Sequence, residues 1–119
     1  MMHIYKDFHF DAAHWLPKVP EEHMCRRLHG HTYKLRVWCA GAIGDSGMVV
    51  DYREIADAVR PVIDVLDHHL LNEIPGLSNP TTEVLAQWIF NKLVSVGLPQ
   101  LKSVEISESS TTGCMYGVL

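Results

Sequence analysis

The chain has 119 residues, enough for one domain near the lower end of sizes that bury an adequate core alone. Its net charge of −4 argues against nucleic acid or an anionic membrane as a direct partner, and no apolar run is long enough to span a bilayer. The three cysteines are an odd number and do not make a disulfide framework, and the N-terminal residues lack the apolar core of a signal peptide. We therefore expect a single domain over residues 1–119 in a reducing, cytoplasmic compartment.

The first predicted element is a strand from Met2 to His14, where polar and apolar residues alternate. Its even positions are apolar apart from Lys6, and His14 stands at the end of that apolar row. A polar loop with two prolines follows, over residues 17–23.

A second alternating strand is predicted from about Leu28 to Ala40. Residues two apart on a strand point to the same face, so His29 and His31 lie side by side on the apolar face, with Cα atoms about 6–7 Å apart. Gly30 between them leaves room for a close approach to the backbone.

The three histidines at these strand ends form the candidate metal site. His14, His29 and His31 all fall on the buried parity of their strands, where two neighbouring strands can meet. Each alone is best explained as a core histidine bonded to a backbone carbonyl, but three on matching faces favour a shared metal ion. A His₃ set leaves the fourth tetrahedral position open, which is typical of a catalytic zinc.

Two helices are predicted between the second and third strands. Asp51 and Glu54 have capping-box spacing at the start of the first helix, which ends near Leu66 and contains Pro61, where we expect a kink or a broken hydrogen bond. Its apolar stripe comprises Ile55, Val59, Val62, Ile63 and Leu66.

The second helix is expected to begin with Asn79 as its N-cap and Pro80 in its first turn, and to stop at Gly97 and Pro99. Its apolar face comprises Leu85, Trp88, Ile89, Leu93 and Val96.

Two strands close the chain, roughly over residues 102–109 and 113–118. The order β-β-α-α-β-β predicts an α+β fold, a four-stranded antiparallel sheet with both helices on one face.

Two polar features remain after this assignment. Glu108 continues the apolar row of Val104 and Ile106, so its carboxylate either binds a partner or ligand, or is solvated where the strand frays. Asp67 and His68 follow the first helix; a carboxylate beside an imidazole suits acid–base work, and a histidine favoured by the helix dipole is the alternative, which we accept for His69.

Cys25 lies four residues before His29, in the loop beside the expected cation, where a thiol loses its proton more readily. A loop cysteine without a function is the alternative. Cys39 and Cys114 fall within predicted strands and are interpreted as packing residues.

With these residues the chain resembles the 6-pyruvoyl-tetrahydropterin synthase family, and within it the bacterial branch that forms 6-carboxy-5,6,7,8-tetrahydropterin. The resemblance extends over the whole chain and rests on motifs in the same order, which are Phe10-Asp11-Ala12-Ala13-His14, Cys25-Arg26-Arg27-Leu28-His29-Gly30-His31, Met48-Val49-Val50-Asp51-Tyr52, Leu66-Asp67-His68-His69-Leu70-Leu71-Asn72, Asn79-Pro80-Thr81-Thr82-Glu83 and the segment around Glu108. It implies a tunnelling fold (T-fold), in which protomers join their sheets into barrels, usually as homohexamers with active sites at subunit interfaces.

The resemblance also implies roles for individual residues. His14, His29 and His31 match the zinc ligands of the family. Cys25 matches its catalytic thiol, Asp67 and His68 its acid–imidazole pair, and Glu108 the carboxylate that anchors the pterin.

The spacing from Cys25 to His29 resembles the carboxy-forming branch, because the pyruvoyl-forming enzymes have a longer gap. Relatives with glutamate in place of the cysteine are linked to a folate-pathway reaction, against which Cys25 argues.

The implied enzyme is a zinc-dependent lyase of queuosine biosynthesis that converts 7,8-dihydroneopterin triphosphate to the carboxypterin, acetaldehyde and triphosphate. The alternatives are a pyruvoyl-tetrahydropterin synthase with the same site and a non-catalytic metal- or pterin-binding module. The sequence does not identify the residues that would hold the triphosphate.

Overall fold

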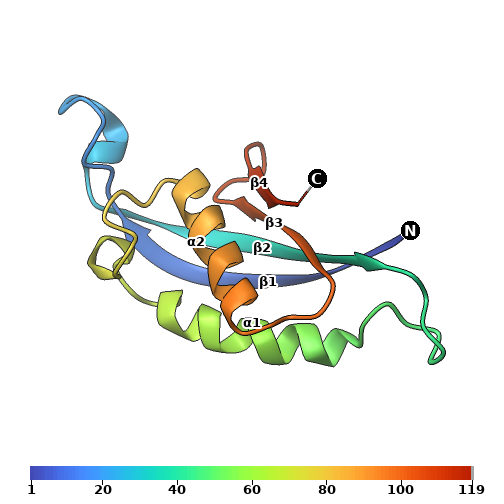
Figure 1. Ribbon diagram of the computed structural model, residues 1–119. Helices are drawn as coiled ribbons and strands as arrows, with labels where there is room; N and C mark the ends of the chain where they lie inside the picture. Colours follow the sequence, from blue (N-terminus) through green and yellow to red (C-terminus); the bar gives the residue numbers. More distant parts are fainter. Residues whose placement is uncertain (119) are drawn as a thin grey trace.

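Two long antiparallel strands, β1 (Met2–His14) and β2 (His29–Gly41), make up most of the sheet in the computed structural model, which describes residues 1–118 (Figure 1). Two shorter strands, β3 (Leu101–Ser107) and β4 (Cys114–Gly117), extend it in the order β1-β2-β3-β4, with every neighbouring pair antiparallel. Between β2 and β3 lie two helices, α1 (Tyr52–Leu66) and α2 (Thr82–Ser95). A short 3₁₀ turn at Met24–Arg26 lies between β1 and β2, and another at Leu71–Glu73 lies between the two helices. The predicted element order is confirmed.

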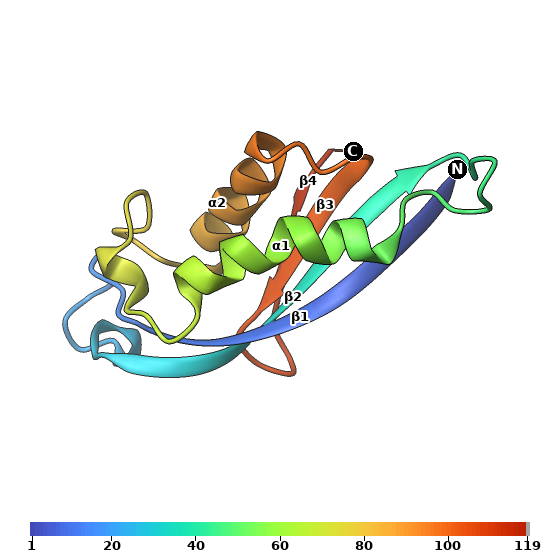
Figure 2. The same cartoon turned by 90° about the horizontal axis from the view of Figure 1, so that it is seen from below.

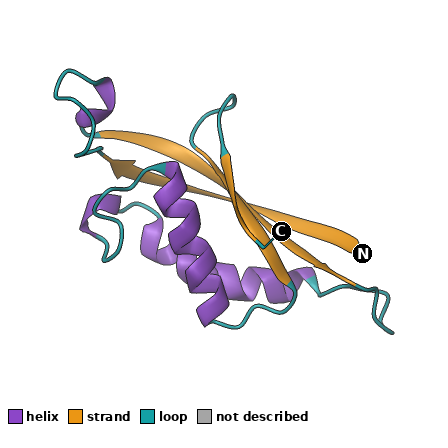
Figure 3. Cartoon of the chain, turned by 45° about the horizontal axis from the view of Figure 1, so that its top comes forward, coloured by secondary structure: helices purple, strands orange, loops and turns teal. Residues whose placement is uncertain are grey.

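Both helices cover the same face of the sheet, as Figures 2 and 3 show. The core lies between the two layers, and its side chains come from the strand and helix faces that were predicted to be apolar. The strands contribute Phe8, Phe10, Ala12, Tyr33, Leu35, Val37, Val104 and Ile106, and the helices Ile55, Val59, Val62, Leu66, Leu85, Ile89 and Leu93. None of the helices in the described part of the chain is long and apolar enough to cross a membrane.

The first helix starts as predicted, with a different hydrogen bond at its cap. The Asp51 carboxylate accepts from the Arg53 N–H at 2.8 Å, whereas a capping box would use the N–H of the next residue, Glu54. The helix runs without interruption across Pro61, whose side chain faces solvent. Because proline lacks an N–H, the backbone bond at Pro61 is absent even though the helix continues.

The predicted start of the second helix is wrong. Thr81, not Asn79, is the N-cap, and its hydroxyl accepts from the Val84 N–H at 3.1 Å. Pro80 lies before the helix and is buried, so it belongs to the loop rather than to the first turn.

The end of this helix explains a second error. Gly97 has φ +75°, and the Gly97 and Leu98 N–H groups donate to Val94 and Leu93 carbonyls at 3.0 and 3.2 Å, which closes the last turn. Val96, the C-cap, is 56% exposed, although the periodicity placed it on the apolar face of the helix.

The face of the sheet opposite the helices is polar. The Arg36 guanidinium donates to both Asp7 carboxylate oxygens, at 2.7 and 3.0 Å, and stacks 3.8 Å from the centre of the Tyr5 ring. The arginine holds the pKa of Asp7 below its ordinary value. Beside it, the Trp38 indole N–H donates to the Glu105 carboxylate.

Candidate active site

The strand register brings the three predicted metal ligands together. His14 is the direct partner of His29 in the β1–β2 pair, and Ala12 is the partner of His31, so all three rings project from the helix-covered face. One ring nitrogen from each lies within 4.8 Å of the others. His14 is almost fully buried, and the other two are half-buried.

Backbone carbonyls fix the orientation of two of these rings. The His14 Nδ1–H donates to the Pro80 carbonyl at 2.8 Å, and the His29 Nδ1–H donates to the Arg27 carbonyl at 2.6 Å. Each neutral ring then presents an unprotonated Nε2, and these two atoms lie 3.0 Å apart. Two lone pairs at that distance repel each other unless a cation lies between them and the third ring.

Burial and charge support the same interpretation. Burial lowers the pKa of His14, so its ring is neutral near pH 7, the form that binds a metal. The His31 Nε2 is buried and has no hydrogen-bond partner among residues 1–118, which is unfavourable for a polar atom without a ligand. This group of three imidazoles can bind a metal ion.

Glu108 lies beside the imidazoles, just beyond the end of β3. One carboxylate oxygen is 3.8 Å from the His14 Nε2 and 3.6 Å from the His31 Nε2, and the side chain is 29% exposed. The strand therefore ends before Glu108, earlier than predicted, yet the carboxylate points toward the histidines rather than into solvent.

The predicted acid–imidazole pair forms a separate cluster. An Asp67 carboxylate oxygen lies 3.0 Å from the His68 Nδ1 and accepts from the Asp11 N–H at 2.9 Å. The Asp11 N–H, and then His68, lower the pKa of Asp67, which is therefore ionised near neutral pH. Within one chain these residues do not join the three-histidine group over the described residues 1–118.

Cys25 occupies the 3₁₀ turn in the loop between β1 and β2. Its N–H donates to the His23 ring at 3.0 Å, and its carbonyl accepts from the Leu16 N–H at 2.8 Å, which ties the loop down near the strand ends. The residue is half-buried. In the part of the chain that the structure describes, its sulfur is not a member of the three-histidine group.

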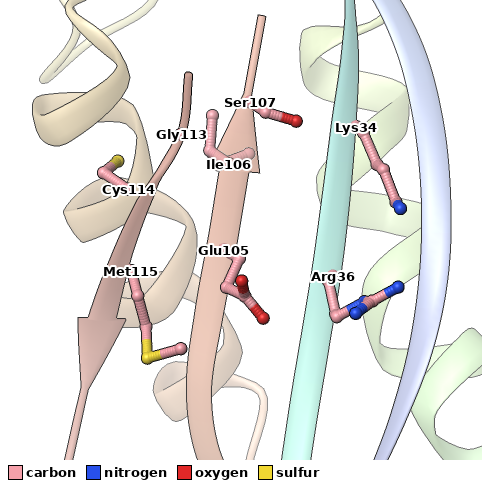
Figure 4. Close-up of a pocket in the computed structure, with 8 residues that line it drawn as sticks. All are labelled: Lys34, Arg36, Glu105, Ile106, Ser107, Gly113, Cys114 and Met115. Atoms are coloured by element: carbon pink, nitrogen blue, oxygen red, sulfur yellow. The ribbon is translucent and has the colours of Figure 1, made fainter. Parts of the chain in front are cut away.

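Two hollows flank the strands near these residues. One, of about 530 Å³, adjoins both the predicted metal ligand His31 and His68 of the predicted acid–imidazole pair. The other, of about 350 Å³, lies on the polar face between β2, β3 and β4 (Figure 4). None of the predicted site residues lines this second hollow, where the Arg36 side chain points from β2 toward β1, the strand that carries its partner Asp7.

Three residues of this region were not found by sequence reasoning. The Tyr33 hydroxyl lies 3.2 Å from the His14 Nδ1, the Pro80 carbonyl accepts from that nitrogen, and Asp11 contacts the Asp67–His68 pair. Tyr33 lies on the same face of β2 as His29 and His31, so the alternation of the sequence could have indicated that it lies beside the histidines. The sequence gave no sign of the role of Pro80, because that role belongs to a backbone carbonyl in a loop far from His14 in the sequence.

Comparison with known proteins shows the family of the chain. A sequence profile described as 6-pyruvoyl tetrahydropterin synthase matches residues 3–118. The chain belongs to this family. A 6-carboxy-5,6,7,8-tetrahydropterin synthase of Synechocystis sp. is 43% identical over 119 residues, covering 95% of this chain and 91% of the relative. A dihydroneopterin monophosphate aldolase of Pyrococcus furiosus is 38% identical over 107 residues, 87% of each chain.

The fold is shared with solved structures of the family. The 6-pyruvoyl tetrahydropterin synthase of Caenorhabditis elegans superposes with a TM-score of 0.90 at 26% identity, over 99% of this chain and 96% of the nematode chain. The resemblance inferred from the motifs and the expected T-fold are both confirmed.

Proposed function

We propose that this chain, an enzyme of the 6-pyruvoyl tetrahydropterin synthase family, converts 7,8-dihydroneopterin triphosphate to 6-carboxy-5,6,7,8-tetrahydropterin, with release of acetaldehyde and triphosphate. The observation that carries the proposal is the group of three imidazoles with the Glu108 carboxylate within 4 Å of two of them. The Synechocystis relative that carries the name of this synthase supports the choice of product.

The proposed metal is zinc, held by His14, His29 and His31. Two fixed imidazoles with free Nε2 atoms and a third whose buried nitrogen lacks a partner fit a His₃ zinc site with an open position. When bound, zinc would supply Lewis acidity to side-chain hydroxyls of the substrate.

Protein side chains provide the remaining chemistry in this proposal. Glu108 accepts hydrogen bonds from the amide and amino groups of the pterin, a charge-assisted pair that orients the ring. The Cys25 thiolate takes a proton from the substrate side chain, and His68, oriented by the Asp67 carboxylate 3.0 Å away, moves protons on the opposite side.

The proposal includes an assembly and a pathway. The Asp67–His68 pair and the three histidines are separate clusters within one chain, which supports an active site completed by a neighbouring copy in a homohexamer. The product class belongs to queuosine biosynthesis, and the proposed substrate is a small pterin triphosphate, with no contact to nucleic acid or membrane.

A second candidate is an aldolase that cleaves a dihydroneopterin phosphate, and it is favoured by the relative from Pyrococcus furiosus. A pyruvoyl-forming synthase is a third outcome on the same scaffold. The three reactions leave different pterin products, so product identity separates them.

The test is incubation of the zinc-loaded protein with dihydroneopterin triphosphate, with products identified by mass. Carboxytetrahydropterin together with acetaldehyde supports the proposal, whereas a pyruvoyl product, a hydroxymethyl product or no turnover contradicts it. Cys25→Ala should bind zinc and pterin normally and turn over about 10²-fold more slowly, because only proton transfer requires the thiol.

Cys114→Ala is the matched control and should keep its turnover, because burial raises the pKa of the Cys114 thiol and disfavours the thiolate. Near-normal turnover in Cys25→Ala would remove this residue from the mechanism.

A further inference from the structure

The histidine of the proposed acid–base pair has an unusual backbone conformation. His68 has φ +59°, the left-handed region that residues other than glycine rarely adopt. Strand β1 holds it there, because the His68 N–H donates to the Asp11 carbonyl at 2.6 Å. Two residues further along β1, the Ala13 N–H donates to the His69 carbonyl at 3.1 Å, so residues 67–70 run beside the end of this strand (Figure 2).

The same residue of β1 also holds the carboxylate of the pair. The Asp11 N–H donates to the Asp67 oxygen that lies 3.0 Å from the His68 Nδ1. Asp11 thus fixes both members, through its N–H to the Asp67 side chain and through its carbonyl to the His68 backbone. The result is an imidazole whose Nδ1–H is directed at a carboxylate and whose Nε2 stays available.

The side chain of Asp11 is fixed in turn by the neighbouring strand. Asp11 and Thr32 are direct partners in the β1–β2 register, and the Thr32 hydroxyl donates to the Asp11 carboxylate at 2.5 Å. Both side chains project from the face opposite the metal ligands and line the hollow that adjoins His68. One oxygen of Asp11, one of Asp67 and a ring nitrogen of His68 lie within 4.8 Å of one another.

We propose that Asp11, held by Thr32, is a positioning residue for the Asp67–His68 pair. This role rests on the proposed function only in that His68 is the group that moves protons. The bond between the two strands restrains the peptide groups on either side of Asp11, and these groups set the backbone of His68 and the carboxylate of Asp67. Loss of the Thr32 hydroxyl therefore loosens the pair and leaves in place every side chain to which the proposed function gives a role.

The first measurement does not depend on activity. Nitrogen-15 NMR of the His68 ring, assigned by its loss in His68→Gln, should show the Nδ1–H tautomer as the main neutral form. Thr32→Val, which keeps the shape and removes the hydroxyl, and Asp11→Ala should both lower that fraction. Thr32→Ser should restore it, and Thr112→Val should leave it unchanged, because the exposed Thr112 hydroxyl bonds to Ser109 and not to Asp11.

The second measurement is turnover. We expect Asp11→Ala and Thr32→Val each to lower kcat about 10-fold with KM nearly unchanged, because a misdirected proton-transfer group affects the chemical step. If Thr32 acts through Asp11, the double variant should be no slower than Asp11→Ala. Zinc content should equal that of the wild type. This would show that the lower turnover does not come from loss of metal through a displaced His31, which is next to Thr32.

The outcomes separate this proposal from the proposed function. An unchanged His68 tautomer in Asp11→Ala and Thr32→Val overturns the positioning role, whatever the turnover. Fully additive losses in the double variant also overturn it. A shifted tautomer in a protein that does not turn over the pterin supports the positioning role and contradicts the proposed function alone.

Discussion

The Nε2 atom of His31 gives the most direct reason to expect a metal ion at the histidine group. The His31 Nε2 is buried and lacks a hydrogen-bond partner among residues 1–118, and the free Nε2 atoms of His14 and His29 lie 3.0 Å apart. A buried ring nitrogen without a partner and two facing lone pairs are unfavourable by themselves. A cation shared by the three atoms would remove both costs, which is why we expect a metal ion at this group.

Removal of one ligand should therefore release the metal and preserve the fold. We expect His31→Ala and His29→Ala to lose the roughly one zinc ion per chain that the wild type should carry. Both side chains are half-buried at the end of the sheet, so the core beneath them should remain packed. The metal content of the purified proteins, measured by mass spectrometry, checks this.

His9→Ala is the control for this experiment, because His9 is an exposed histidine on the opposite parity of β1. It should retain its zinc. Wild-type metal content in both ligand variants would show that the three histidines are not the site.

At the scale of elements, alternation predicted the strands well because burial on one face leaves a clear signal. It placed β1 at its observed bounds and put His14, His29 and His31 on the correct face. It could not set the boundary at Glu108, because an apolar row does not show where the ladder of hydrogen bonds stops.

The helix caps show a different limit. The segment Asn79-Pro80-Thr81 offers two residue types that cap helices, and local preference alone did not choose correctly between them. The choice was made by tertiary structure, because the Pro80 carbonyl accepts from the buried His14 ring and keeps Pro80 outside the helix. The pairing of Asp11 with Asp67 and His68 was hidden for the same reason, since it joins segments 56 residues apart.

The observed cap gives a prediction for stability. Thr81→Ala removes the acceptor of the Val84 N–H and should lower the free energy of unfolding by about 1 kcal/mol. Asn79→Ala should cost clearly less, because in the structure Asn79 caps no helix. Urea denaturation followed by circular dichroism, at one protein concentration for all variants, measures both. A larger loss for Asn79→Ala than for Thr81→Ala would favour the cap expected from the sequence.

The molecule as a whole is too elongated for a compact domain of its length. Its extents are 56 × 24 × 21 Å and its radius of gyration is 15.2 Å, against about 13.5 Å for a typical domain of this size. The length comes from β1 and β2, which run past the helices at both ends (Figure 1). Such a shape leaves strand edges open, because β4 and the first part of β1 have no outer neighbour within residues 1–118.

These open edges are where we expect neighbouring copies to continue the sheet, and β4 gives a way to test it. A Cβ atom at Gly117 would lie 2.3 Å from the Lys102 carbonyl oxygen, so Gly117→Val should force β4 away from β3. Light scattering coupled to size exclusion should report a hexamer for the wild type and smaller species for this variant, because its outer edge strand is displaced. Val94→Ala, at an exposed position on α2, should remain hexameric. A wild-type monomer, or a Gly117→Val hexamer of unchanged stability, would contradict assembly through this edge.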